Sequence, residues 1–153
     1  MLSMTDVPLW AQIILDGPVS STEQPHSTQG CANSCLVLLA HGSKDPRWRE
    51  PFERIFLKVR RKSKLVKLAY MEFTGPTLFE VAEECANEGV LECRVLPLFM
   101  ASGAHLARDI PEQIEEIRAV HPEVRIGLLA PIGEDPRVTS LLKQIICEQT
   151  EQI

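Results

Sequence analysis

Residues 36–47 read LVLLAHGSKDPR and place a histidine directly after a short apolar run. The apolar residues have the length of a buried strand, and the glycine, serine, aspartate and proline that follow are typical of a turn. After the turn, the apolar residues recur at the spacing of a helix, and Pro51 is suited to a first helical turn. We therefore predict a strand over residues 36–40, a loop that carries His41, and a helix that starts near Pro51.

The same alternation of an apolar run with a helical pattern occurs four times after residue 35. The further strands are predicted at residues 66–71, 91–99 and 124–130, and the later helices begin at proline-containing signals near Pro76, Pro111 and Pro136. The helix residues expected to face the core are Phe52, Ile55, Phe56 and Val59, then Leu78, Phe79, Ala82, Cys85 and Ala86, then Ile114, Ile117 and Val120, and finally Val138, Leu141, Leu142 and Ile145.

A βα unit repeated four times indicates an α/β fold. Successive parallel strands need right-handed crossovers, so we expect a four-stranded parallel sheet with helices on both faces and the strand order 2-1-3-4. That order makes the first three strands neighbours. Their carboxyl ends carry His41, Glu72 and His105, and parallel sheets build their sites at this edge. The three side chains are therefore predicted to converge.

Composition limits the classes of protein and of partner. A chain of 153 residues with 44% hydrophobic and 24% charged residues has the proportions of one globular domain and excludes a disordered or fibrous class. Its 16 basic and 21 acidic residues give a net charge of −5, which argues against binding to nucleic acid or to an acidic membrane. An anionic ligand would have to be held by local positive charges.

The first 34 residues differ from the rest because they contain no lysine or arginine. Residues 20–34 are rich in Ser, Thr, Gln and Asn, and the apolar cluster at residues 7–15 is too short to span a bilayer. The segment also lacks the basic residues of signal and transit peptides. We therefore expect a flexible amino-terminal extension over residues 1–34, a domain over 35–153, and a cytoplasmic protein.

The five cysteines form no C-x-x-C pair, which fits a reducing compartment. Cys85 and Cys147 fall on apolar helix faces and Cys93 falls within a strand, so all three are predicted to be buried. Cys31 and Cys35 are an alternative metal or disulfide pair. A lone C-x-x-x-C spacing lacks the other ligands of a zinc site, and this alternative is disfavoured.

Two imidazoles and a carboxylate leave open positions on a divalent metal ion, and neutral imidazole also accepts protons. A single histidine is more often structural, but His41 and His105 follow separate strands, and each lies beside glycine and serine. For Glu72 a structural alternative remains, because a carboxylate here could cap the helix that starts near Pro76. His26 and His121 lie away from this edge, in the amino-terminal segment and at a helix end, and are expected to be solvated.

Four further residues flank the same loops and are candidate substrate ligands. They are Ser43, Lys44, Ser102 and Arg108. Lysine and arginine bind carboxylates, and the adjacent glycines allow close approach of a ligand to the backbone. Ordinary turn chemistry and solvated charges are the alternatives for these loops, which also contain Arg47 and Arg49.

The ordered set His41-Gly-Ser-Lys-Asp-Pro46, Met71-Glu72 with Pro76-Thr-Leu78, and Pro97-Leu-Phe-Met-Ala-Ser-Gly-Ala-His105 with Asp109-Ile-Pro111 resembles the small CbiX-type sirohydrochlorin chelatases. The resemblance covers roughly residues 35–147. It implies a class II chelatase-like, flavodoxin-like half-domain that inserts cobalt, iron or nickel into sirohydrochlorin, a precursor of cobalamin, sirohaem and coenzyme F430. It implies no organic cofactor, with Co²⁺, Fe²⁺ or Ni²⁺ as a substrate.

The resemblance also implies roles for individual residues. His41 and His105 would hold the metal and help to remove the pyrrole protons, with Glu72 as their partner. Sirohydrochlorin is a polycarboxylate, so the four loop residues would grip it by charge and hydrogen bonding. Small members of the family form homodimers, and a homodimer is expected here.

Two other classes of function share some of these features. A phosphoryl-transfer enzyme with His41 as its nucleophile would usually have an arginine directly before the histidine, whereas this chain has Ala40. A non-catalytic carrier of metal or tetrapyrrole would use the same ligands as a chelatase. Turnover distinguishes a chelatase from a carrier, because a carrier binds its ligand only stoichiometrically.

Overall fold

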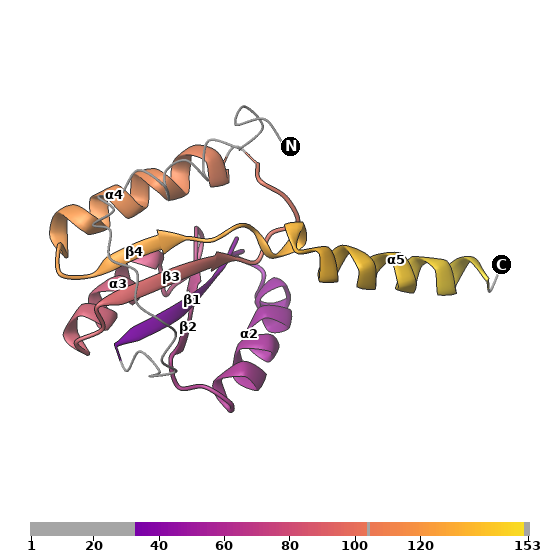
Figure 1. The fold of residues 1–153 in the computed structure, drawn as a ribbon, viewed down its shortest axis with the longest axis horizontal. Coiled ribbons are helices and arrows are strands. Elements are labelled where there is room, and N and C mark those ends of the chain that lie inside the picture. The colour runs from indigo at the N-terminus through magenta and orange to yellow at the C-terminus, as the bar shows by residue number, and fades with distance from the viewer. Residues whose placement is uncertain (1–32, 104, 152–153) are drawn as a thin grey trace, which may run out of the picture. The chain divides into compact units, whose positions relative to one another are not determined.

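The computed structural model describes residues 33–103 and 105–151, with only the backbone described at His105 and Leu106. Strands and helices alternate along the chain (Figure 1). The strands are β1 (Ser34–Ala40), β2 (Val66–Tyr70), β3 (Glu92–Pro97) and β4 (Arg125–Leu128), and the helices are α2 (Pro46–Arg60), α3 (Leu78–Asn87), η1 (His105–Asp109), α4 (Ile110–Val120), η2 (Ile132–Glu134) and α5 (Pro136–Thr150). The predicted extension, residues 1–34, lies outside the described residues except for its last two.

The four strands form one parallel sheet in the order β2-β1-β3-β4, which confirms the predicted fold class and strand order. At the centre of the sheet Leu39 of β1 is in register with Ala69 of β2 and with Pro97 of β3. The carboxyl ends of these three strands therefore reach the same edge of the sheet. The strands predicted at residues 91–99 and 124–130 are shorter than expected, since pairing stops where the chain turns into the loops of this edge.

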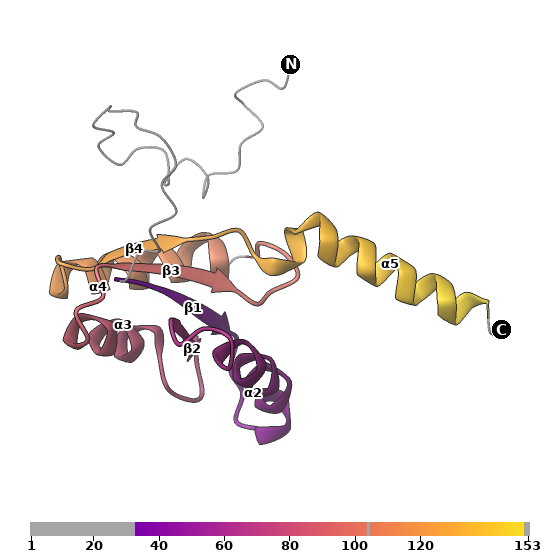
Figure 2. The same cartoon turned by 60° about the horizontal axis from the view of Figure 1, so that its bottom comes forward.

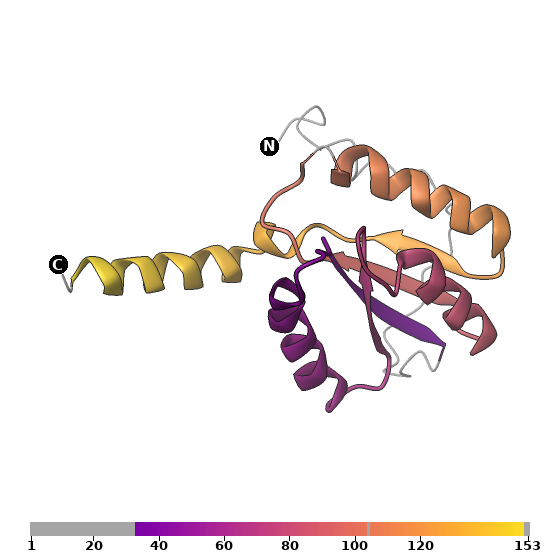
Figure 3. The ribbon, with the colours of Figure 1, turned by 180° about the vertical axis from the view of Figure 1, so that it is seen from behind.

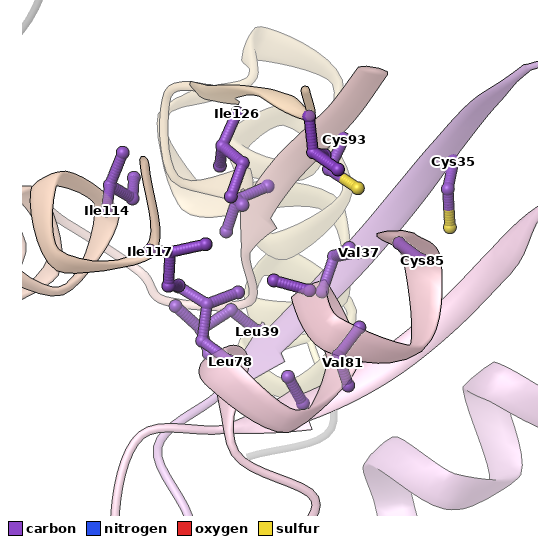
Figure 4. Close-up of a cluster of buried hydrophobic side chains, with 14 of the residues drawn as sticks. Cys35, Val37, Leu39, Leu78, Val81, Cys85, Cys93, Ile114, Ile117 and Ile126 are labelled. Carbon is purple, nitrogen blue, oxygen red and sulfur yellow. The ribbon is translucent and has the colours of Figure 1, made fainter. Parts of the chain in front are cut away.

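Helices α3 and α4 cover one face of the sheet, and α2 covers part of the other (Figure 2). The larger core lies beneath α3 and α4, where side chains of both helices meet β1, β3 and β4 (Figure 4). It contains Val37, Leu39, Leu78, Val81, Ile114, Ile117 and Ile126. The smaller core lies beneath α2 and contains Leu38, Ala40, Val66, Leu68 and Tyr70. Both faces of β1 and β2 are thus buried.

Helix α2 begins at Pro46, so the predicted start near Pro51 is wrong. The side chain of Asp45 accepts a hydrogen bond from the amide of Arg47 at 3.0 Å, and Pro46 occupies the first helical position. This N-cap followed by proline is the stronger start signal. Pro51 is accommodated inside the helix.

Three of the cysteines pack together in the larger core, as Figure 4 shows for Cys35, Cys85 and Cys93. Hydrogen bonding to Cys85 together with burial raises the pKa of the Cys35 and Cys93 thiols. Burial of Cys85 and Cys93 confirms their predicted place in the core. The prediction for Cys147 is wrong, because this residue is exposed on α5.

Helix α5 departs from the sequence prediction because none of its residues is buried. It continues beyond the carboxyl ends of the strands instead of folding back over the sheet (Figures 1 and 3). Of its predicted core residues, Leu141, Leu142 and Ile145 are exposed and Val138 is half-buried. The amphipathic pattern was identified correctly, but the described part of the chain holds no surface against which it packs.

No helix among the described residues has the length and apolar character needed to cross a membrane.

Candidate functional site

The loops after β1 and β2 run side by side, because parallel pairing continues past the ends of both strands. The amide of Met71 donates to the carbonyl of Ala40 at 2.9 Å, and the amide of Glu72 donates to the carbonyl of His41 at 3.2 Å. This backbone pairing brings two of the predicted site residues together. Nδ1 of His41 lies 3.3 Å from Oε1 of Glu72, and both side chains remain partly accessible, at 47% and 39% exposure.

Gly42 makes this close approach possible. Its φ is +91°, and a Cβ atom added there would lie 2.0 Å from the carbonyl oxygen of Glu72. Any side chain at this position would push the two loops apart. The glycine after His41 therefore accommodates the neighbouring loop.

The contact between His41 and Glu72 orients the imidazole and favours the proton on Nδ1. A neutral imidazole that donates its Nδ1 proton to a carboxylate carries its lone pair on Nε2, which can then bind a metal ion or accept a proton. The alternative role of Glu72 as a helix cap is wrong. Thr77 caps α3 in a reciprocal pair with Glu80, which satisfies the start of that helix without Glu72.

A cavity of about 150 Å³ opens beside His41. It is lined by His41, Gly42, Trp48, Arg49, Phe52, Tyr70, Leu98 and Phe99. The ring of Phe99 lies 6.0 Å from that of His41, centroid to centroid. Burial raises the pKa of the Tyr70 hydroxyl, with the nearby negative charge of Glu53 adding to the effect, so this phenol stays protonated.

Sequence reasoning did not identify the aromatic wall of this cavity. Tyr70 and Phe99 stand at or just past strand ends, where the sequence shows only apolar runs. Trp48 is 66% exposed and also borders a neighbouring open hollow of about 400 Å³ that is formed by the first turns of α2. In the sequence, Trp48 stands between Arg47 and Arg49, and an aromatic residue flanked by charges so close to a candidate ligand was the signal that could have revealed this surface.

The four predicted substrate ligands have different environments. Ser43 Oγ accepts from the amide of Asp45 at 3.1 Å, and Lys44 Nζ lies 5.8 Å from the centre of the Phe73 ring. Ser102 Oγ donates to Glu134 at 2.7 Å, and Arg108 Nε donates to Asp109 at 3.2 Å. Ser43 therefore takes part in the turn chemistry considered above. Lys44 and Arg108 remain exposed, so a carboxylate ligand can reach both.

His105 is the first residue of η1, a π-helical turn that leads directly into α4. π-Helical turns are rare in proteins, but many of those that occur lie at functional sites. Sequence analysis did not predict this turn. The side chain of His105 lies outside the described residues, and its convergence with His41 stays a prediction. Among the side chains that the structure describes, no three histidines, cysteines or carboxylates form a metal-binding group.

His121 lies at the carboxyl end of α4, where its Nδ1 is 3.3 Å from Oε1 of Glu123. It takes no part in the pairing of His41 with Glu72 or in the cavity beside them. Its side chain is only 16% exposed, so the expectation that it is solvated is wrong. His26 lies outside the described residues.

A family model described as CbiX matches residues 35–149. The chain belongs to the CbiX family. Among its curated relatives, the sirohydrochlorin cobaltochelatase of Sulfurisphaera tokodaii is 36% identical over 113 residues, which cover 74% of this chain and 91% of the relative. The enzyme of the same name from Sulfolobus acidocaldarius is 33% identical over 109 residues, which cover 71% of this chain and 86% of that one.

Solved structures of other CbiX and SirB proteins share the fold. A CbiX protein from Marinobacter aquaeolei, named for cobalamin (vitamin B12) biosynthesis, is 37% identical with a TM-score of 0.71, and the match covers 78% of this chain and 99% of that one. The sirohydrochlorin chelatase SirB of Bacillus subtilis subspecies spizizenii, in complex with cobalt, is 24% identical with a TM-score of 0.65. That match covers 76% of this CbiX chain but only 50% of SirB.

Proposed function

We propose that this CbiX protein is a chelatase that inserts a divalent metal ion into sirohydrochlorin. The observation that carries the proposal is the His41–Glu72 pair beside a cavity walled by aromatic rings. The curated relatives named sirohydrochlorin cobaltochelatase support the same reaction. The metal ion is a substrate, taken as Co²⁺, Fe²⁺ or Ni²⁺, because imidazole ligands accept all three ions. The product would serve cobalamin, sirohaem or F430 synthesis.

In this proposal His41 binds the incoming metal ion through Nε2 while Glu72 fixes the ring at Nδ1. His105 supplies the second imidazole from the start of η1. Because only a small number of protein ligands hold the ion, some of its coordination positions stay open. Pyrrole nitrogens can enter these positions and then replace the protein ligands one at a time. Once the ion has passed to the macrocycle, the Nε2 lone pair of His41 would no longer be engaged by the metal. It would then accept a proton that a pyrrole nitrogen loses, and the Glu72 carboxylate would stabilise the imidazolium that forms.

The flat substrate would lie against the aromatic wall, with Trp48 and Phe99 in contact with its rings. Its carboxylates would meet the basic side chains of the surrounding loops. Arg49 lines the cavity, Lys44 is exposed on the loop that follows β1, and Arg108 is exposed on η1. Ser43 and Ser102 would add hydrogen bonds by exchanging their present partners for substrate oxygens.

We further propose that the protein works as a cytoplasmic homodimer. One sheet edge offers half of a cleft, and a second copy would face it with the other half. The coverage of only half of the B. subtilis chain is consistent with a longer enzyme that contains two such halves. The cluster of Cys35, Cys85 and Cys93 as free thiols fits a reducing compartment.

The test is an anaerobic absorbance assay with sirohydrochlorin and each of the three metal ions. A chelatase forms many equivalents of metallated product per protein chain above the spontaneous rate. A carrier of metal or tetrapyrrole, the second candidate, changes the spectrum only up to one equivalent. Spectral change that stops at stoichiometry with every metal would overturn the chelatase assignment in favour of the carrier.

A further inference from the structure

Directly after Glu72, the loop that follows β2 makes a strained turn centred on Phe73. The φ of Phe73 is +63°, and no other non-glycine residue that the structure describes has a positive φ. The amide of Thr74 donates to the carbonyl of Glu72 at 2.8 Å, which closes a turn of three residues around the phenylalanine. A positive φ at the centre marks the rare and strained form of γ-turn. The backbone at Phe73 is therefore held in a conformation that costs free energy.

Phenylalanine is an unfavourable residue for this turn. At positive φ a Cβ atom crowds the backbone, whereas glycine adopts the conformation freely and asparagine tolerates it. Packing does not explain the choice either, because the side chain of Phe73 is 59% exposed and belongs to neither core. Strained residues cluster at active sites and ligand clamps, where the surrounding structure holds them in place. An exposed ring in such a turn therefore indicates contact with a ligand.

Neighbouring residues hold the turn from both sides. On one side, the amide of Glu72 donates to the carbonyl of His41 at 3.2 Å. The carbonyl oxygen of Glu72 also lies so close to Gly42 that a Cβ atom there would be only 2.0 Å away. On the other side, Nη1 of Arg49 on α2 donates to Oγ1 of Thr74 at 3.2 Å. The strained backbone is thus fixed beside the His41–Glu72 pair.

The ring of Phe73 also borders a positive charge. Nζ of Lys44 lies 5.8 Å from the ring centre, within the range of a cation–π contact. Lys44 comes three residues after His41 on the neighbouring loop, and it is exposed as well. An apolar ring and an ammonium group thus stand together close to the proposed metal ligand. A ligand with a flat apolar face and negative groups at its edge matches both.

The size of the cavity beside His41 explains why a contact outside it is needed. The cavity volume is about 150 Å³, whereas pockets that enclose small-molecule ligands have volumes of about 300–1,000 Å³. A tetrapyrrole is a large member of that class, so most of the macrocycle must lie outside the cavity. The residues that line the cavity do not include Phe73. Its ring is therefore available to the part of the macrocycle that the cavity does not enclose.

We propose that Phe73 is a substrate-binding residue whose ring packs against the face of sirohydrochlorin outside the cavity. Lys44 then exchanges its contact with the ring for a carboxylate at the edge of the macrocycle. Stacking on the flat substrate offsets the strain of the turn, which keeps the ring exposed in the free protein. The inference rests on the chelatase function proposed above, and it adds a residue that recognises the tetrapyrrole and not the metal ion.

The first experiment measures the binding of metal-free sirohydrochlorin by anaerobic calorimetry, so that no chelation takes place. Phe73→Gly should weaken the affinity about 10-fold, and Phe73→Tyr, which keeps the ring, should stay within about twofold of wild type. Leu91→Ala is the matched control, because Leu91 is 50% exposed but lies directly before β3, at the opposite edge of the sheet. In the insertion assay, Phe73→Gly should raise KM for sirohydrochlorin by the same factor and leave kcat nearly unchanged.

The binding data distinguish failure of this inference from failure of the proposed function. If wild type does not bind sirohydrochlorin, the chelatase function fails and the inference fails with it. If wild type binds and Phe73→Gly binds equally well, the ring makes no contact with the substrate, and only the inference fails. An equal loss of affinity in Leu91→Ala would also overturn it, because the effect would not be specific to the site.

The second experiment separates a binding role from a structural one by urea unfolding. Phe73→Asn relieves the strain, because asparagine tolerates a positive φ, and it avoids the extra chain entropy that glycine adds to the unfolded state. This variant should lose affinity as Phe73→Gly does but unfold at a urea concentration no lower than wild type. A lower unfolding midpoint would show that the ring serves stability and would overturn the inference. A changed mass in light scattering with wild-type affinity would assign the ring to a protein contact instead.

Discussion

Nδ1 of His41 lies 3.3 Å from Oε1 of Glu72, and the two residues reach this position from the ends of different strands. Backbone pairing beyond β1 and β2 sets the distance, and Gly42 leaves the room for it. The imidazole is therefore oriented before any ligand arrives. Preorganisation of this kind supports the proposal that His41 is a metal ligand.

Replacing His41 by alanine should lower enzyme-dependent metal insertion by about 100-fold or more, since both the metal ligand and the proton acceptor are lost. His105→Ala should have a similar effect. Folding should be retained in His41→Ala because the side chain is 47% exposed and lies outside both cores. Initial rates with the spontaneous background subtracted test this, with circular dichroism as the check on folding. Near-wild-type rates in either variant would remove that histidine from the mechanism.

Glu72→Gln should cost less, about 10- to 100-fold, because the amide oxygen still accepts the Nδ1 proton but no longer stabilises a positive imidazole. Glu72→Ala, which cannot hold the ring at all, should be slower than Glu72→Gln. Metal affinity of the free protein, measured by calorimetry, should fall in the same order. Equal rates for the Gln and Ala variants would show that orientation of His41 by this carboxylate contributes nothing.

Gly42→Ala should disrupt both stability and chelation. Positive φ alone costs a non-glycine residue about 1–2 kcal/mol, and the clash with the Glu72 carbonyl adds about 1–3 kcal/mol. Gly89→Ala is the matched control because its φ is +73° but its Cβ would meet nothing within 4 Å. Urea unfolding should show the smaller loss for Gly89→Ala, with the chelation rate unchanged. Equal losses of unfolding free energy in the two variants would mean that the loops after β1 and β2 can move apart without loss of stability.

Much of the fold could be predicted because the β-strands are short apolar runs and the helices between them have a clear period. Right-handed crossovers with helices on both faces limit the possible strand orders, and the order expected from them placed Glu72 beside His41 before the distance was known. The exposure of α5 could not be predicted, because periodicity indicates an apolar face and does not say whether another element covers it. The aromatic wall was missed for a related reason: Tyr70 and Phe99 have the same local pattern as core residues.

Removing the amino-terminal extension should leave chelation largely intact, since the residues assigned to the site all lie in the domain that follows. The cut belongs after residue 32, because the carbonyl of Asn33 accepts from the amides of Leu91 and Glu92 at 2.8 and 3.2 Å and Ser34 begins β1. A chain that starts at residue 33 should match the full chain in initial rate and in the number of subunits per particle. A folded but inactive truncation would place the extension in the site or in the dimer.

The cap of α5 should make this helix sensitive to acid. Hydrogen bonds from the Arg137 side chain and amide lower the pKa of Asp135 from its ordinary 3.8 to about 2. Because the folded-state pKa is the lower one, the cap stabilises α5 above about pH 4, and its contribution disappears as the pH falls through about 2. Asp135→Asn should reduce helicity at pH 5 but not at pH 2, as followed by circular dichroism. Arg137→Met keeps the hydrogen bond from the backbone amide of residue 137 but removes those from the side chain. The midpoint pH of the acid transition should therefore move upward, toward 3.8. If wild type and Asp135→Asn differ equally at both pH values, the carboxylate charge plays no part in the cap.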